Sequence, residues 1–347
     1  MSYSVIKGTS YVLVHVPGMV MDHGTTQTTE KVVNPDSDYL KVLPSHIRSY
    51  EDCVAYPPNQ TYIGNLPIEE LAEIPEPWAD KKVEKPERFG KFGEIMPEDE
   101  FILLMQICDA FDLVHLDKDF VAAVRPKLEA RPLMNERILA LLKEGVDAEE
   151  VEEFINEEHA SAISYEGKNV GFVKRAHDVD VNLSAHVMFE NLVSKASSVL
   201  SLLHLVKNAG IDASEVDYVI DCCEEACGDM NQRGGGNFAK ASAEIAGFLN
   251  ATGSDTRSFC AGPAHAVVEA ASMVKAGTFK NVVVTGGGSS AKLGMNGKDH
   301  VKKGLPILED ALGAFAVLIS ENDGKSPEIN TNILGSHKVG TGSAPQA

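Results

Sequence analysis

Cys260 has the sequence surroundings that most favour nucleophilic chemistry. It lies in the run SFCAGPAHAVVEAASMVKAG, and we expect it to end a short strand over residues 256–260. The first turn of the helix that follows would hold Ala261, Gly262 and Pro263. A thiol there would face the unpaired N–H groups and positive dipole end of the helix, which favour a thiolate and could stabilise an oxyanion. We therefore predict a nucleophilic Cys260 with Ala261 and Gly262 beside it, and keep a small buried cysteine as the alternative.

Two further sets of side chains could act near this thiol. His265 lies about one and a half helical turns beyond Cys260, so we predict that it packs behind the thiol rather than acting as the general base. The run CCEEAC supplies Cys222, Cys223 and Cys227 at the end of a predicted strand. A metal site would need paired C-x-x-C spacing or a fourth nearby ligand, and neither is present in the run. We predict no metal here and place Cys227 in a loop that faces the cleft, behind the thiol.

Two glycine runs fit the loose G-x-G-x-x-A pattern of nucleotide-binding turns: Gly234, Gly236 and Ala239, then Gly286, Gly288 and Ala291. The first run precedes a predicted helix but lies more than ten residues beyond its strand. The second follows a strand, but no convincing helix comes after it. A nucleotide-dependent oxidoreductase therefore stays an alternative, while tight turns in an α/β sheet are the interpretation we favour. Under that interpretation Gly286, Gly287 and Gly288 line the pocket of the thiol, and the chain holds no cofactor.

Strands and helices that could position these residues alternate after residue 180. Apolar residues spaced by 4, 3, 4 and 3 mark a helix that ends at Gly210, and a second helix from Phe238 should end at Gly253. The other predicted elements are strands at 216–223, 281–288 and 311–320 and a helix at 263–276. This alternation is typical of a mainly parallel or mixed sheet with helices on both faces.

The first half of the chain has a different character. Residues 4–16 alternate as a strand does, whereas residues 17–95 hold most of the prolines, and we expect loops with short strands there. Residues 98–158 are predicted to be helical, with two helices meeting at Gly145 and Asp147 as an N-cap. This block carries 17 acidic and 6 basic residues. It would form either a solvated outer face or an interaction surface for a basic partner.

Composition excludes several classes of protein. The chain has 347 residues, 31 Lys and Arg against 51 Asp and Glu, and a net charge of −20, so binding to nucleic acid or anionic lipid is not expected. No apolar run approaches the roughly 18 to 20 residues that span a bilayer, and the N-terminus lacks a signal-peptide pattern. Six cysteines in a chain this long do not make a disulfide scaffold. We therefore expect a cytoplasmic protein with reduced thiols.

The order of these elements resembles that of the thiolase superfamily, and within it the ketoacyl synthase III type. The shared features are a helix ending in -GI, a strand like VDYVI, a Cys-Ala-Gly run, a strand like NVVVTGGG and a strand like EDALGAFAVLIS. The resemblance implies an α/β fold, a thiolase-like N-terminal half over 1–330, and Cys260 as its nucleophile. The stretch of about 60–180, which includes the acidic block, would be a helical, Pro-rich insertion. Residues 331–347 would begin a second half that is absent here and would supply the activating base.

Longer strings carry a closer resemblance over the whole chain, namely VIKGTSYVLVHVPGMV, HGTTQTTE, VVNPDSDYL, RSYEDCVAYPPNQTYIGN and SHKVGTGSAPQA. They are similar to the family of β subunits of component C in glycine/sarcosine/betaine reductase complexes of amino-acid-fermenting anaerobes. This resemblance implies an acyl-transfer subunit. It would help convert the Se-carboxymethyl selenoether of selenoprotein component A to acetyl phosphate through a thioester.

The implied partners are an α subunit similar to phosphate acyltransferases and component A, with phosphate as a co-substrate. A second hypothesis stays open, in which the subunit is a non-catalytic docking scaffold for the α subunit. In that case the acidic block at 98–158 and the Pro-rich arm would bind the partner.

Overall fold

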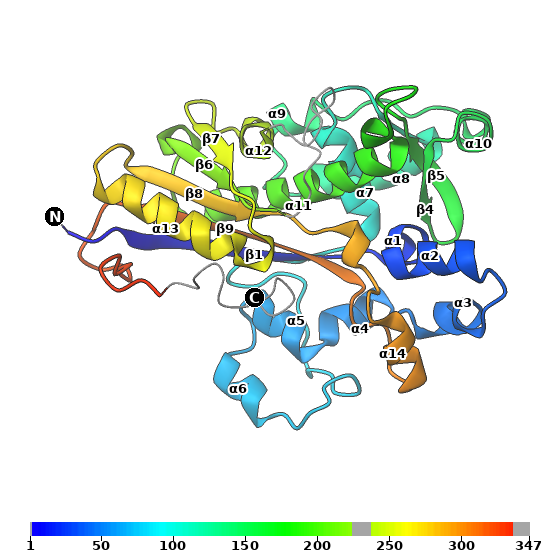
Figure 1. The fold of residues 1–347 in the computed structure, drawn as a ribbon, viewed down its shortest axis with the longest axis horizontal. Helices are drawn as coiled ribbons and strands as arrows, with labels where there is room; N and C mark the ends of the chain where they lie inside the picture. Colours follow the sequence, from blue (N-terminus) through cyan, green and yellow to red (C-terminus); the bar gives the residue numbers. More distant parts are fainter. Residues whose placement is uncertain (1, 224–236, 336–347) are drawn as a thin grey trace, which may run out of the picture.

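A mixed six-stranded sheet organises the chain, of which the computed structural model describes residues 2–223 and 237–335 (Figure 1). The strand order is β2-β1-β9-β8-β6-β7. The strands are β1 (Val5–His15), β2 (Ile95–Met96), β6 (Tyr218–Asp221), β7 (Thr252–Asp255), β8 (Asn281–Gly286) and β9 (Ala311–Ser320). β9 is antiparallel to both β1 and β8, and the other neighbouring pairs are parallel. The predicted α/β fold with a mixed sheet is therefore confirmed.

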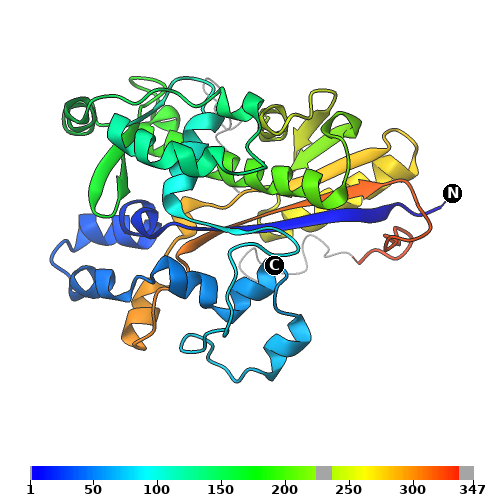
Figure 2. The same cartoon turned by 180° about the vertical axis from the view of Figure 1, so that it is seen from behind.

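Helices α11 (Ala185–Ala209) and α13 (Gly262–Lys275) cover opposite faces of this sheet. Figure 1 shows α13 in front of the strands, and Figure 2 shows α11 in front. Side chains of β8 alternate accordingly, because Val283 packs in the core beside α11 whereas Val282 and Val284 pack against α13. α11 ends at Gly210, whose φ of 60° few other residues adopt, as the sequence predicts.

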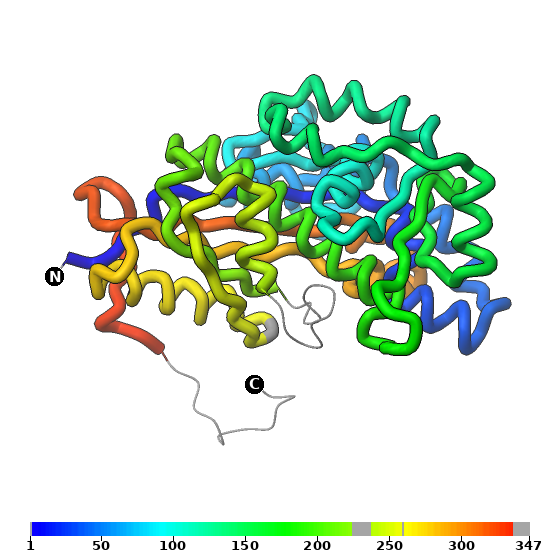
Figure 3. Tube along the Cα trace, turned by 90° about the horizontal axis from the view of Figure 1, so that it is seen from above, coloured from blue at the N-terminus to red at the C-terminus, as the bar shows by residue number. Residues whose placement is uncertain are grey.

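A second, three-stranded sheet and a set of mostly short helices complete the structure (Figure 3). The small sheet has the order β3-β5-β4 and comprises β3 (Val114–Leu116), β4 (Ser161–Tyr165) and β5 (Lys168–Val173). The remaining helices are α1 (Pro17–His23), α2 (Thr25–Val33), α3 (Asp38–Val42), α4 (Tyr50–Ala55), α5 (Pro57–Tyr62), α6 (Ile68–Glu73), α7 (Glu98–Cys108), α8 (Lys118–Glu129), α9 (Glu136–Leu139), α10 (Ala148–Asn156), α12 (Phe238–Ala246) and α14 (Gly297–Lys302). Short 3-10 helices span Leu43–His46, Val181–Leu183, Ala213–Glu215, Phe259–Ala261 and Ser290–Lys292. Among the described helices, none has the length and apolar character needed to cross a membrane.

The expectation of loops and short strands over residues 17–95 is wrong, since this region contains six α-helices, α1 to α6. Two of its prolines begin helices, with Pro17 at the start of α1 and Pro57 at the start of α5. Ser37 and Ser49 cap α3 and α4, each accepting a backbone N–H with its hydroxyl. These helices are five to nine residues long, too short for an apolar period to stand out in the sequence.

Two predicted boundaries near the candidate thiol are also wrong. The strand predicted at 256–260 lies at Thr252–Asp255, and Cys260 falls in the 3-10 helix Phe259–Ala261. α12 ends at Gly247, which has a φ of 90°, and not at Gly253. Gly253 belongs to β7, where a Cβ would lie 2.5 Å from the Val219 carbonyl oxygen, so close strand pairing explains this glycine.

The predicted helical character of residues 98–158 is confirmed by α7 to α10, with Asp147 at the N-cap of α10. The acidic residues at the start of this block form neither the solvated face nor the interaction surface that the sequence suggests, because they are buried. Glu98, Asp99 and Glu100 are buried, as is every other residue of α7. Arg131 forms an ion pair with Glu100, so part of the acidic charge is compensated inside the protein.

Candidate functional site

Cys260 lies at the edge of the sheet where three parallel strands end. β6, β7 and β8 run in the same direction, so the residues that follow each of them meet at one edge. Cys260 directly precedes Ala261, the N-cap residue of α13. Of the five described cysteines it is the exposed one, and the other four are buried. A buried Cys260, the alternative considered from the sequence, therefore does not apply.

Cys222 lies between Gly262 and Gly286, two of the residues predicted to line the pocket. A Cβ on Gly262 would lie 3.5 Å from Cys222 Cβ, and a Cβ on Gly286 would lie 3.5 Å from Cys222 Sγ. The Cys222 thiol is 3.2 Å from the Thr285 carbonyl oxygen, to which it donates a hydrogen bond. Burial raises the pKa of Cys222 to about 12, so this thiol stays protonated and serves as a small spacer between α13 and the end of β8.

Gly287 and Gly288 allow the glycine turn after β8 to approach α11 closely. A Cβ on Gly287 would lie 1.9 Å from the carbonyl oxygen of Ser194, which no side chain could tolerate. The N–H of Gly288 donates a hydrogen bond to Ser197 Oγ over 2.9 Å. This amide already has a partner, and the structure accounts for the glycines by packing. The 3-10 helix Ser290–Lys292 follows them, without the longer helix that a dinucleotide turn would need.

Arg257 forms a charged cluster at the edge of the sheet where β6, β7 and β8 end. The sequence did not reveal this cluster. Its guanidinium donates to Asp221 Oδ1 over 3.3 Å, to Asp255 Oδ2 over 3.2 Å and to the sulfur of Cys223 over 2.9 Å. Asp221 is fully buried, and burial raises its pKa. Burial likewise raises the pKa of Cys223. Asp255 also accepts the backbone N–H groups of Phe238 and Ala239, so it caps the first turn of α12.

The remaining predicted partners of Cys260 lie apart from it or outside the described residues. His265 is exposed on the second turn of α13 and makes no hydrogen bond to Cys260 in the described part of the chain. The N–H of Ala261 donates to the Ser258 carbonyl oxygen. Cys227, Gly234 and Gly236 fall within residues 224–236, outside the described residues.

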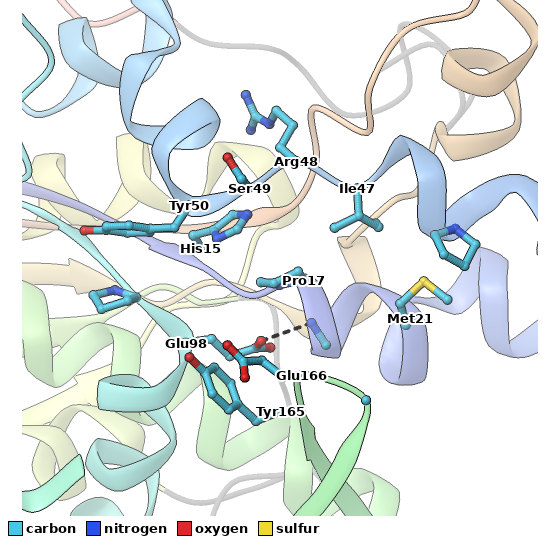
Figure 4. Close-up of a pocket in the computed structure, with 14 residues that line it drawn as sticks. His15, Pro17, Met21, Ile47, Arg48, Ser49, Tyr50, Glu98, Tyr165 and Glu166 are labelled. Atoms are coloured by element: carbon cyan, nitrogen blue, oxygen red, sulfur yellow. Dashed lines mark hydrogen bonds between the residues drawn. The ribbon is translucent and has the colours of Figure 1, made fainter. Parts of the chain in front are cut away.

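A separate cavity of about 360 Å³ lies at the carboxyl ends of β1 and β2 (Figure 4). Glu98, Tyr165 and Glu166 lie together on one side of it, and His15 and Ser49 lie on the other. The Glu98 carboxylate accepts the backbone N–H groups of Gly18 and Met19 over 3.1 and 3.0 Å. Burial nevertheless raises the pKa of Glu98 to about 8, so this carboxyl is mostly protonated at neutral pH. Glu98 was missed because its EDE run has the composition of an ordinary acidic helix start.

His15, Cys53 and Asp310 form the group in the described residues that could hold a metal ion, with ligand atoms within 4.8 Å of one another. Arg48 occupies the place that a cation would take, because its guanidinium binds both carboxylate oxygens of Asp310. In Figure 4 the guanidinium points away from the cavity. Asn59 donates to the Cys53 sulfur, and burial raises the pKa of this thiol, which disfavours the thiolate that a metal binds. We interpret the group as a buried ion pair that fixes the end of β1.

Comparison with known proteins shows that Cys260 lies in a stretch that matches one family profile. The 3-oxoacyl-[acyl-carrier-protein (ACP)] synthase III family profile matches residues 254–337. The priming β-ketosynthase of the R1128 polyketide pathway is 22% identical, with a TM-score of 0.29, over 37% of this chain and 36% of its own. The synthase III of Aquifex aeolicus VF5 is 20% identical, with a TM-score of 0.29, over 37% and 39%. These two structural likenesses are too limited to bear on function.

One relative matches the entire chain. Glycine/sarcosine/betaine reductase complex component C subunit beta of Peptoclostridium acidaminophilum is 58% identical over 349 residues. The alignment covers 100% of this chain and 68% of that protein. Identity at this level over the whole chain shows that it belongs to the family of component C β subunits of glycine/sarcosine/betaine reductase complexes.

Proposed function

We propose that this chain is an acyl-transfer subunit of a glycine/sarcosine/betaine reductase complex and that Cys260 carries the acyl group as a thioester. The observation that supports this most is the exposed thiol at the start of α13, where three parallel strands end. Its position within the stretch matched by the synthase III family is in accord with acyl chemistry. The positive end of the α13 dipole would stabilise negative charge that develops on an acyl oxygen.

The proposed chemistry starts from the Se-carboxymethyl selenoether on selenoprotein component A. A C–H bond replaces the C–Se bond, and selenium joins a thiol of component A in a Se–S bond, which supplies the two electrons. The carboxyl group loses one oxygen as water when the Cys260 sulfur bonds to its carbon. Phosphate then attacks the thioester carbonyl, giving acetyl phosphate and returning the Cys260 thiol.

This scheme requires a general base that the described residues do not supply. Within residues 2–223 and 237–335, no side chain forms a hydrogen bond to Cys260. We propose that the assembled complex supplies the base and that the α subunit of component C and component A are the partners. In this proposal residues 1–330 form a thiolase-like half-domain interrupted at about 60–180.

The test replaces Cys260 with Ser in the assembled complex. Carboxymethylated component A and phosphate are added, and acetyl phosphate is measured. We expect C260S to assemble normally and to lose acetyl phosphate formation. Cys108→Ala is the matched control, because this buried thiol belongs to α7 and should leave turnover unchanged. Full turnover in C260S would remove Cys260 from the mechanism and leave the docking-scaffold role.

A labelling experiment addresses the same point without a substitution. Iodoacetamide near neutral pH should modify Cys260 selectively and faster than a small-molecule thiol, with the site identified by peptide mass spectrometry. Reaction at the rate of an ordinary exposed thiol would favour the scaffold instead.

A further inference from the structure

Lys195 differs from the other buried cationic side chains of this protein. In the described part of the chain, three Lys or Arg residues are buried, and Arg48, Arg131 and Lys195 are each 7% exposed. Arg48 binds Asp310, and Arg131 binds Glu94. Lys195 has no hydrogen bond or ion pair with any described residue. The side chain of Lys195 is mostly buried, but its ammonium nitrogen is not sealed from solvent, so the charged end is accessible from the cavities that it lines. An anion that enters there would meet a cation with no partner among the described residues.

Two cavities that share lining residues meet at Lys195. A narrow cavity of about 30 Å³ and an open groove of about 520 Å³ are both lined by Lys195, Ala110 and Phe111. The narrow cavity has room for a group of one or two non-hydrogen atoms beyond those that line it. Phe248 and Leu249 give the groove an apolar wall, and Leu249 is exposed.

Asp109 also lines the narrow cavity but does not neutralise Lys195. Its carboxylate accepts the backbone N–H groups of Leu113 and Val114 over 2.7 and 2.9 Å. It also forms an ion pair with Lys143 at 2.8 Å. With the N–H of Phe111 at 3.1 Å, Asp109 already has four donors, whereas no described residue accepts a hydrogen bond from the ammonium group of Lys195.

We infer that Lys195 binds the carboxylate or phosphate group of a small organic anion whose apolar part lies in the groove beside α12. The charged group lies against Lys195 where the two cavities meet, with at most one of its oxygen atoms in the narrow cavity, and the groove takes the remainder of the ligand. This site lies close to the strand ends, because Phe238 lines the narrow cavity and also packs against the Arg257 guanidinium, 5.5 Å from its ring centre. The inference does not depend on the proposed function of Cys260.

The test measures thermal unfolding of the full chain in Tris chloride with added anions. Without an added anion, Lys195→Met should unfold at an equal or higher temperature than the wild type, because the substitution removes a cation that pairs with no described carboxylate and leaves the mostly buried apolar stem in place. Inorganic phosphate, or the carboxylates from acetate to hexanoate, should raise the wild-type Tm by about 2–3 °C at ten times Kd. The same anions should leave K195M unchanged.

The matched control is Lys240→Met, which removes an exposed lysine from the same groove and should keep the full response to anions. A response to phosphate alone would identify a phosphate ester as the ligand class. A response that grows with the length of the carboxylate would identify an organic acid. Equal stabilisation of wild type and K195M, or no shift in the wild type with any of these anions, would overturn the inference.

A measurement on the unaltered protein covers the case in which K195M does not fold. Acetic anhydride should acetylate Lys195, and the bound anion should protect it, as read by peptide mass spectrometry. Lys240 provides the internal reference. Acetylation of Lys195 that no anion slows would contradict the inference.

Discussion

Replacing Glu98 with Gln should change how the stability of this protein depends on pH. Burial raises the pKa of Glu98 from 4.5 to about 8 in the folded protein, whereas the unfolded chain keeps the ordinary value. The folded state therefore binds the proton more tightly, and its stability falls as pH rises from about 5 to about 8. The loss is about 1.4 kcal/mol per pH unit and reaches about 5 kcal/mol once the carboxyl is ionised in both states.

Urea unfolding at pH 6 and pH 8 measures this effect. Between these values the free energy of unfolding of the wild type should fall by about 2 kcal/mol relative to that of E98Q, which cannot ionise there. Taking the difference between the two proteins removes the contribution of every other titrating group. Glu166→Gln at the exposed edge of the same cavity is the control and should follow the wild type. Parallel pH profiles for wild type and E98Q would show that burial does not perturb Glu98.

Two further substitutions test the packing and the buried ion pair. Gly287→Ala should lower stability by about 3 kcal/mol in urea unfolding, because its Cβ would lie 1.9 Å from a carbonyl oxygen of α11. Gly335→Ala, whose Cβ meets nothing within 4 Å, should have little effect, and equal losses would contradict the packing argument. Asp310→Asn should cost about 3–5 kcal/mol in the same assay, since it leaves the Arg48 guanidinium buried without its carboxylate. A loss below about 1 kcal/mol would mean that this pair contributes no more than an exposed one.

The sequence was sufficient for the elements whose periodicity is long. β1, β8 and β9 were predicted because their apolar residues form runs that match a half-buried or fully buried strand. α11 was predicted from an apolar spacing over about four turns, from Leu192 to Val206, and from Gly210. α13 was predicted from Pro263 and Gly277 at its two ends. These signals are local, so they need no knowledge of the tertiary structure.

The features that the sequence could not provide arise from contacts between distant segments. Glu98 is buried because α7 packs on all sides, although an acidic helix start usually faces solvent. Arg257 meets Asp221 only because parallel pairing brings the ends of β6 and β7 together. Cys260 precedes a helix as the sequence predicts, although it lies in a 3-10 helix and not at the end of a strand. Its exposure and the absence of a described hydrogen-bond partner depend on how α13 docks.

Asp255 links the start of α12 to Arg257, so a movement of one would affect the other. One carboxylate holds the first two N–H groups of α12 and also the guanidinium of Arg257. A tilt of α12 toward an occupant of the adjacent groove would pull on that carboxylate and so reposition the positive charge beside the strand ends. Occupancy of the groove would then affect the strand ends through one side chain, because the Asp255 carboxylate accepts two hydrogen bonds from α12 and one from Arg257.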